Sequence, residues 1–437
     1  MQERITKAII TASYDDDGNF EEKVRRQYEK EVKSGYYLPT HLFLRNRNQH
    51  KVTKFNFPMP IGGLMNSSVP MISFAMLNTS RSELENIAVV GDETTRTNAE
   101  FLKDYFNDSK ITYSSEGKEW KFSKTIENGM KSLSPESDEL VLILMGDTPL
   151  KYDFDRILVD RDIGKSDLIA DVNTRRKTGR CWPRKHHAKI FYRGRYLLFK
   201  EPQILLANIR KINELSENLG LEEPIWDMVY DSRKAHGNKG KSRKEKIFDI
   251  LFPDPITGFS TLKDFGMIYN LQMLRHVLRK NGKPFPVNPK AIYRAVENRT
   301  GLRFLLKADN DDPATIEDVD GLADWANLSE MLSIAGDSIY PYYSEIKRFG
   351  EAIMPELRRR LDFYYGFEDY MNALFRKYSL PEPYVGKGDF VNPFTSDKID
   401  VKTRKRSNKI IKGSIKLHKR YLRKMKIRRW LADQTFS

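Results

Sequence analysis

The stretch Leu140-Val-Leu-Ile-Leu-Met-Gly-Asp147-Thr-Pro149-Leu150 places an unbroken apolar run directly before a glycine, an aspartate and a proline. A short apolar run that ends in turn residues predicts a strand buried on both faces. In open α/β sheets ligands bind beyond the carboxyl ends of such strands, so we expect Asp147 at the edge of a crevice, holding a divalent ion against phosphates. Because Gly-Asp-Thr-Pro is also good turn chemistry, a simple turn is the alternative.

The length and composition indicate a large main domain with an appendage. The chain has 437 residues, of which 39% are hydrophobic, and its only cysteine is Cys181. One cysteine excludes a disulfide framework and a cysteine-rich zinc site, and it fits a reducing compartment. No apolar window reaches the roughly 18 residues of a spanning helix, and the start of the chain does not look like a signal peptide. We therefore expect a soluble cytoplasmic protein.

The net charge of +15 is concentrated near the end of the sequence. Residues 401–432 contain fourteen lysines and arginines and no acid. Ile411, Ile415, Leu422 and Met425 recur at helical spacing within this tail, which predicts a basic amphipathic helix. The tail is therefore the candidate for peripheral binding to an anionic membrane surface or to a nucleic acid. The residues expected to contact the polyanion are Arg404, Lys405, Arg406, Lys419, Arg420, Arg423, Arg428 and Arg429.

Alternating apolar runs and helical stretches predict a mostly parallel central sheet flanked by helices, an α/β fold of Rossmann-like type. The predicted strands cover residues 8–13, 87–92, 140–145, 167–172 and 196–199, and the predicted helices cover 69–77, 100–106, 204–219 and 409–431. We expect an α/β domain over residues 1–332, a helical extension and linker over 333–400, and the basic tail over 401–437.

Three short motifs, in this order along the chain, resemble those of a known enzyme group. Pro60-Ile-Gly-Gly63 precedes a predicted helix, Gly146-Asp147-Thr-Pro149-Leu150 follows the buried strand, and Ile316-Glu-Asp318-Val-Asp320 lies late in the domain. Together they resemble nucleotidyltransferases of the glycosyltransferase-A-like fold, the MobA-like and sugar-phosphate nucleotidyltransferase group. The group opens with a glycine-rich phosphate loop. Here the segment from Thr11 to Asn19 has one glycine and three acids, and an acidic loop repels a triphosphate unless a metal intervenes.

The resemblance implies transfer of a nucleoside monophosphate from a nucleoside triphosphate to a sugar or polyol phosphate, with Mg²⁺ or Mn²⁺ as cofactor and release of pyrophosphate. Asp147 would be the first metal ligand and Asp320 or Asp318 the second, although both of the latter also suit a helix N-cap. Lys54, Arg175 and Arg176 would act as catalytic clamps on the phosphates. The nucleotide would contact Thr11, Ala12, Ser13, Gly62, Gly63 and Asp92, and the acceptor would contact Asn173, Arg180, Arg184, Lys185, Lys200 and Glu201.

Two other functions stay open from the sequence. A glycosyltransferase of the same fold would use an acidic pair such as Asp160 and Asp162 to hold the metal of a nucleotide sugar. A nucleic-acid-binding protein on a degenerate transferase scaffold would explain the altered phosphate loop and the basic tail. Product analysis distinguishes these functions.

Overall fold

A seven-stranded sheet forms the centre of the computed structural model, with the strand order β3-β2-β1-β4-β8-β5-β9. All of its strands run parallel except β8, which is antiparallel to both of its neighbours. A separate hairpin pairs β6 (Ala188–Tyr192) with β7 (Arg195–Phe199). The strands of the central sheet are β1 (Lys7–Thr11), β2 (Asn86–Gly91), β3 (Ile111–Ser115), β4 (Val141–Met145), β5 (Leu168–Asn173), β8 (Ile204–Ala207) and β9 (Phe304–Asn310).

The structure describes part of the chain. The described residues are 5–12, 71–91, 93–117, 121–136, 139–148, 154, 163–173, 188–192, 195–199, 204–218, 224–227, 263, 294, 297–298, 300–310, 312–316, 328, 331–332, 334–360 and 401–435.

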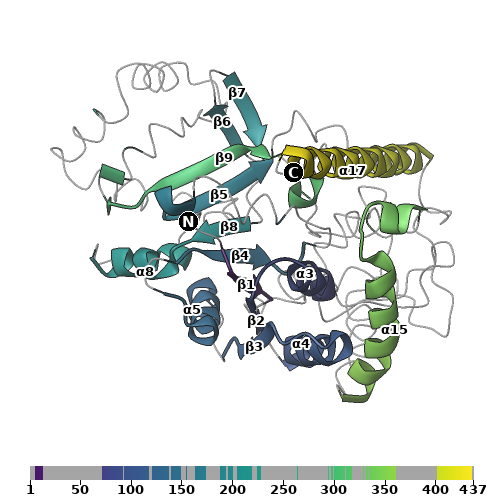
Figure 1. Cartoon of the computed structure of the whole chain (residues 1–437), viewed down its shortest axis with the longest axis horizontal. Coiled ribbons are helices and arrows are strands. Elements are labelled where there is room, and N and C mark those ends of the chain that lie inside the picture. Colours follow the sequence, from purple (N-terminus) through teal and green to yellow (C-terminus); the bar gives the residue numbers. More distant parts are fainter. Residues whose placement is uncertain are drawn as a thin grey trace, which may run out of the picture.

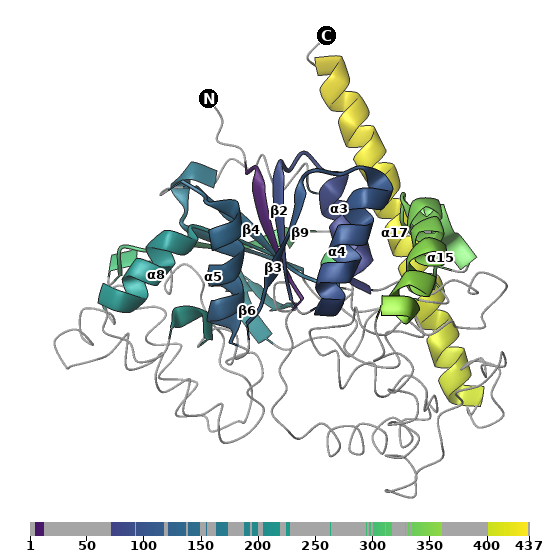
Figure 2. The same cartoon turned by 90° about the horizontal axis from the view of Figure 1, so that it is seen from below.

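Helices cover both faces of the sheet (Figure 1, Figure 2). Side chains of successive strand residues point to opposite faces, so Ala8 and Ile10 of β1 join one apolar cluster and Ile9 joins the other. The central strands are buried on both sides, as their continuous apolar sequence predicts. One face is covered by α3 (Met71–Ser80), α4 (Glu93–Phe106), α15 (Tyr343–Arg360) and α17 (Val401–Thr435), and the other by α5 (Phe122–Leu133) and α8 (Ile209–Asn218).

This architecture confirms the predicted α/β class, with one correction at residues 204–219. Residues 204–207 form the strand β8, not the start of a helix, because this apolar segment pairs with β4 on one side and β5 on the other. The helix begins at Ile209. Asn208 is its N-cap, since its Oδ1 accepts a hydrogen bond from the backbone N of Lys211 at 2.9 Å.

The helix α15 attaches to α4 through aromatic rings. Phe349 packs its ring against Phe101 at 5.9 Å and against Tyr105 at 5.7 Å between centroids. A salt bridge of 2.6 Å between Arg81 and Glu345 fixes the same helix near its start. The aromatic and charged residues of α15 therefore serve packing against the helices α3 and α4.

The middle part of α17, residues 411–421, packs against the domain. Ile411, Ser414, His418 and Tyr421 are buried at intervals of three and four residues, so they form one helical face. Ile411 belongs to the main apolar cluster, and α17 contacts the short helix η2 (Pro313–Ile316). Burial lowers the pKa of His418 to about 4, against the opposing effect of its hydrogen bond to the Ser414 carbonyl. Its imidazole is therefore neutral at pH 7.

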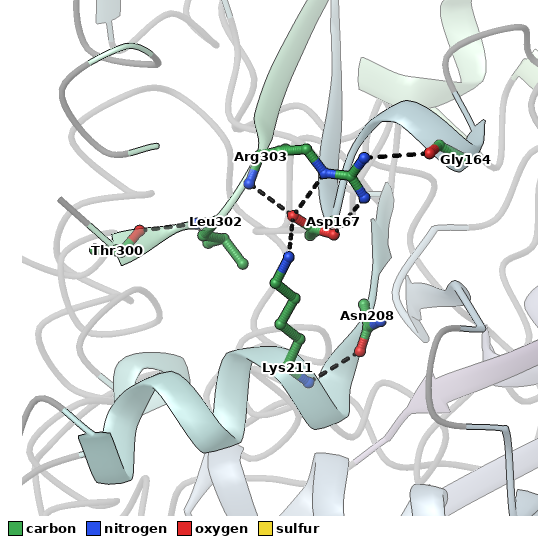
Figure 3. A network of polar contacts seen from close by, with 7 residues as sticks. All are labelled: Gly164, Asp167, Asn208, Lys211, Thr300, Leu302 and Arg303. Atoms are coloured by element: carbon green, nitrogen blue, oxygen red, sulfur yellow. Dashed lines mark hydrogen bonds and ion pairs between the residues drawn. The ribbon is translucent and has the colours of Figure 1, made fainter. Parts of the chain in front are cut away.

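An ion-pair network centred on Asp167 joins three elements at the amino end of the sheet (Figure 3). The side chain of Asp167, which is 4% exposed, accepts hydrogen bonds from the backbone N and the guanidinium of Arg303 at 2.7–3.1 Å and from Lys211 Nζ at 2.9 Å. Burial by itself would raise the pKa of Asp167, but these bonds outweigh it and lower the pKa to about 2. The network ties the start of β5 to the start of β9 and to α8.

Within the described residues, no helix is long and apolar enough to cross a bilayer.

Candidate functional site

The strand order reverses between β1 and β4, and this reversal locates the site. From β1 the chain continues to β2 and β3 on one side, whereas β4, β8, β5 and β9 lie on the other side. Open α/β sheets bind ligands in the crevice outside the carboxyl ends of the strands at such a switch point. The residues at this position are Thr11 and Ala12 at the end of β1, and Gly146, Asp147 and Thr148 directly after β4.

Gly146 brings the turn after β4 against the end of β1. Its backbone N donates a hydrogen bond of 2.9 Å to the carbonyl oxygen of Thr11. A Cβ on Gly146 would lie 2.9 Å from the same oxygen, closer than Cβ atoms approach backbone oxygens in real structures. Glycine is therefore required here by the close approach of two backbones. The consequence is that Asp147 follows at a fixed position beside β1.

Two threonines hold the ends of these strands together. The hydroxyl of Thr148 donates a hydrogen bond of 2.6 Å to the Met145 carbonyl and closes the turn around Asp147. The buried hydroxyl of Thr11 lies 3.5 Å from the Leu144 carbonyl and 3.3 Å from the Met145 sulfur. Gly146 and Thr148 are buried, whereas Asp147 is partly exposed. The turn expected from Gly-Asp-Thr-Pro is thus present, and it holds Asp147 directly beyond the carboxyl end of β4.

Asp171 on β5 was not among the predicted site residues. It is 6% exposed and lies in one row across the sheet with Leu144 of β4 and Ile204 of β8. Its cross-strand partner on β9 is Lys307, and paired residues present their side chains on the same face. The sequence does contain a signal for Asp171, because it is the single acid inside the apolar run of residues 168–172. An acid in that position indicates a buried carboxylate near the carboxyl end of a strand.

A further acid follows β9. Asp312 is 1% exposed, and its Oδ1 accepts a hydrogen bond of 2.9 Å from the backbone N of Ala314. This contact starts the short helix η2, so Asp312 has the role of a helix cap. Within the described part of the chain, no group of three or more His, Cys, Asp or Glu side chains could hold a metal ion by itself.

The structure brings together three of the predicted residues. Thr11 and Ala12 lie at the end of β1, next to the turn after β4 that contains Asp147. Asn173 is the last residue of β5, separated from β4 by β8, so it is not adjacent to Asp147. The tail residues Arg404 to Arg429 belong to α17. The other predicted residues lie outside the described residues: Ser13, Lys54, Gly62, Gly63, Asp92, Arg175, Arg176, Arg180, Arg184, Lys185, Lys200, Glu201, Asp318 and Asp320.

Comparison with known proteins gives only distant structural likenesses. No protein-family model and no curated protein sequence matches the chain. A hypothetical transferase from Thermus thermophilus gives a TM-score of 0.37 at 12% identity over 72% of this chain and 97% of that one. The inositol-1-phosphate CTP transferase from T. maritima gives 0.32 at 12% identity over 54% and 83% of the two chains. The 4-diphosphocytidyl-2C-methyl-D-erythritol synthase from Anaerococcus prevotii gives 0.30 at 16% identity over 50% and 77%.

Proposed function

We propose that the protein is a nucleotidyltransferase, which moves a nucleoside monophosphate from a nucleoside triphosphate to a phosphorylated small acceptor, a sugar or polyol phosphate, and releases pyrophosphate. The observation that carries this proposal is the position of Asp147, on a rigid turn at the switch point between β1 and β4. Open α/β sheets hold phosphates beyond the carboxyl ends of the strands at such a switch point. The motif around Asp147, which resembles that of nucleotidyltransferases, supports the same function.

A single carboxylate beside a phosphate-binding crevice fits Mg²⁺, which is usually bound by one or two carboxylates together with substrate phosphates. When bound, the metal would neutralise charge on the phosphoryl oxygens that develops during transfer. Asp147 would supply the first protein ligand, and Asp318 or Asp320 the second. Mn²⁺ has similar ligand preferences and would serve as a spectroscopic substitute.

The residues around Asp147 would position the reactants. The hydrogen bond between Gly146 and Thr11 keeps the Asp147 backbone in place, so little of its freedom is lost when the nucleotide binds. Thr11 and Ala12 would lie under the nucleotide at the end of β1. Lys54, Arg175 and Arg176 would contact the phosphates as fixed positive charges. The acceptor would contact Asn173, Arg180, Arg184, Lys185, Lys200 and Glu201.

The proposal is tested by a screen of pyrophosphate release. The four nucleoside triphosphates are incubated with phosphorylated acceptors and Mg²⁺, using the full chain and the variant Asp147→Asn. We expect turnover by the wild type and a loss of about 100-fold or more in the variant, because a charge that stabilises the transition state is removed. Glu214→Gln is the matched control, since Glu214 is an exposed acid on α8, which covers the same face of the sheet as α5. Its rate should equal that of the wild type.

Other outcomes of the same screen would select a different function. Equal rates for Asp147→Asn and wild type would remove Asp147 from the site. Release of a nucleoside diphosphate from a nucleotide sugar, with no pyrophosphate formed from any triphosphate, would identify a glycosyltransferase. Salt-dependent binding of RNA or DNA without any turnover would indicate a nucleic-acid-binding protein on a transferase scaffold.

A further inference from the structure

The helix α17 has two opposite faces of different character. The buried face consists of Ile411, Ser414, His418 and Tyr421, which pack towards the domain. At 3.6 residues per turn, Arg420, Ile427 and Leu431 lie on the opposite side of the helix. All three are exposed. The packing of α17 on the domain therefore turns a defined second face away from the protein.

The C-terminal end of this outer face is apolar. Ile427 is 58% exposed, Trp430 60% and Leu431 50%, and their spacing of three and four residues places them side by side. In Figure 2 this end of α17 extends past the sheet and the neighbouring helices. Half or more of the surface of each of these three side chains is exposed, so a broad surface can reach them.

The remainder of the outer face is basic. Lys416, Arg420, Arg423 and Lys424 are exposed and occupy the same side as Ile427, at helical intervals from one another. The surrounding sequence adds to this charge, because residues 401–432 contain fourteen lysines and arginines and no acid. A face of this composition attracts a surface of high negative charge density.

We propose that this outer face of α17, formed by Lys416, Arg420, Arg423, Lys424, Ile427, Trp430 and Leu431, binds the surface of an anionic lipid bilayer. Basic side chains attract the headgroups, while a tryptophan and aliphatic residues on the same face enter the boundary between headgroups and acyl chains. A nucleic acid would use the cations but has no comparable use for exposed isoleucine and leucine. The apolar residues therefore favour the bilayer as the partner.

The geometry fixes how the protein would sit. Residues 416 to 431 span about 22 Å of helix at 1.5 Å per residue, so α17 would lie along the membrane plane over four turns. The buried face would stay on the domain, and the domain would be held at the bilayer without any spanning segment. This docking does not depend on the proposed reaction.

Vesicle sedimentation with the full-length protein tests the proposal. Phosphatidylcholine vesicles with and without phosphatidylglycerol are compared for the wild type and for two variants, Arg423→Glu/Lys424→Glu and Ile427→Ser/Trp430→Ser/Leu431→Ser. Wild type should bind the anionic vesicles and not the neutral ones. Reversal of two basic residues to glutamate should weaken binding about 25-fold or more, since each basic residue contributes roughly fivefold near an anionic surface. The apolar variant should lose about tenfold or more.

Lys103→Glu/Lys131→Glu is the charge-matched control, because these exposed lysines lie on α4 and α5. It should keep at least half of the wild-type affinity. Circular dichroism should show the same helix content for all variants, and the Trp430→Phe variant should lose a fluorescence blue shift that the wild type shows with anionic vesicles. Equal binding of wild type and both α17 variants would overturn the proposal. The proposal would also be overturned if the wild type did not bind vesicles but bound duplex DNA, and if only the Arg423→Glu/Lys424→Glu variant lost this DNA binding.

Discussion

Removal of the Asp167 charge should destabilise the fold in a way that depends on pH. The substitution Asp167→Asn keeps the shape of the side chain but replaces one acceptor oxygen with an amide that faces Arg303 and Lys211. In the wild type these partners hold the pKa of Asp167 at about 2, compared with 3.8 for an ordinary aspartate. A difference of that size corresponds to at most about 2–3 kcal/mol of folding free energy. The side chains of Lys211 and Arg303 are 39% and 43% exposed, so solvent screening reduces the contribution towards about 1 kcal/mol.

The sign of the pH dependence follows from the lowered pKa. Because the folded state binds the proton less tightly than the unfolded chain, the stabilisation is complete above pH 3.8 and is lost as the pH falls through about 2. About half of it should be gone at pH 3. At pH 7 the variant should be less stable than the wild type by about 1–3 kcal/mol, which includes the cost of an amide donor facing two cations.

Urea denaturation at several pH values between 7 and 3 measures this difference directly. The matched control is Glu127→Gln, which removes the exposed pair with Lys124 and should cost no more than about 0.5 kcal/mol. Equal free energies of unfolding for Asp167→Asn and the wild type at pH 7 would contradict a stabilising role of the Asp167 charge. A difference in free energy of unfolding that stays constant down to pH 3 would contradict the lowered pKa.

Two further changes test the packing and the turn. Gly146→Ala should lower the free energy of unfolding by about 1–3 kcal/mol and reduce pyrophosphate release, because the new Cβ would lie 2.9 Å from the Thr11 carbonyl. Urea midpoints and rates of pyrophosphate release that match the wild type would contradict this close approach. Phe349→Ala should cost about 3–5 kcal/mol, since the ring is fully buried between Phe101 and Tyr105. Calorimetry measures this cost, and an unchanged melting temperature would show that α15 does not stabilise the domain.

The central strands could be predicted because their sequences are apolar without interruption. Residues 87–91 and 141–145 are buried on both faces, and each run ends in a glycine that marks the turn. The edge strand β3 was missed, since only Ile111 of its five residues is buried and the pattern is mixed. The helix α5 was also missed, although Phe122, Ile126, Gly129 and Leu133 are buried at helical spacing.

The boundary between β8 and α8 shows a limit of periodicity. A short apolar run followed by an amphipathic helix looks like one longer helix, and only Asn208 as an N-cap distinguishes the two. The turn that contains Asp147 could be predicted because its motif is contiguous. The role of Asp167 could not, because its partner Arg303 lies 136 residues further along the chain, and no local pattern joins them.

We propose that Asp147 holds a divalent ion against nucleotide phosphates beyond the carboxyl ends of β1 and β4. A crystal structure of the protein with Mn²⁺ and a nonhydrolysable nucleoside triphosphate analogue, with the metal located by anomalous scattering, tests this claim. We predict a metal within about 2.3 Å of an Asp147 carboxylate oxygen and bound to phosphate oxygens of the analogue. A nucleotide whose metal lies elsewhere, with Asp147 contacting only its own turn, would contradict the claim.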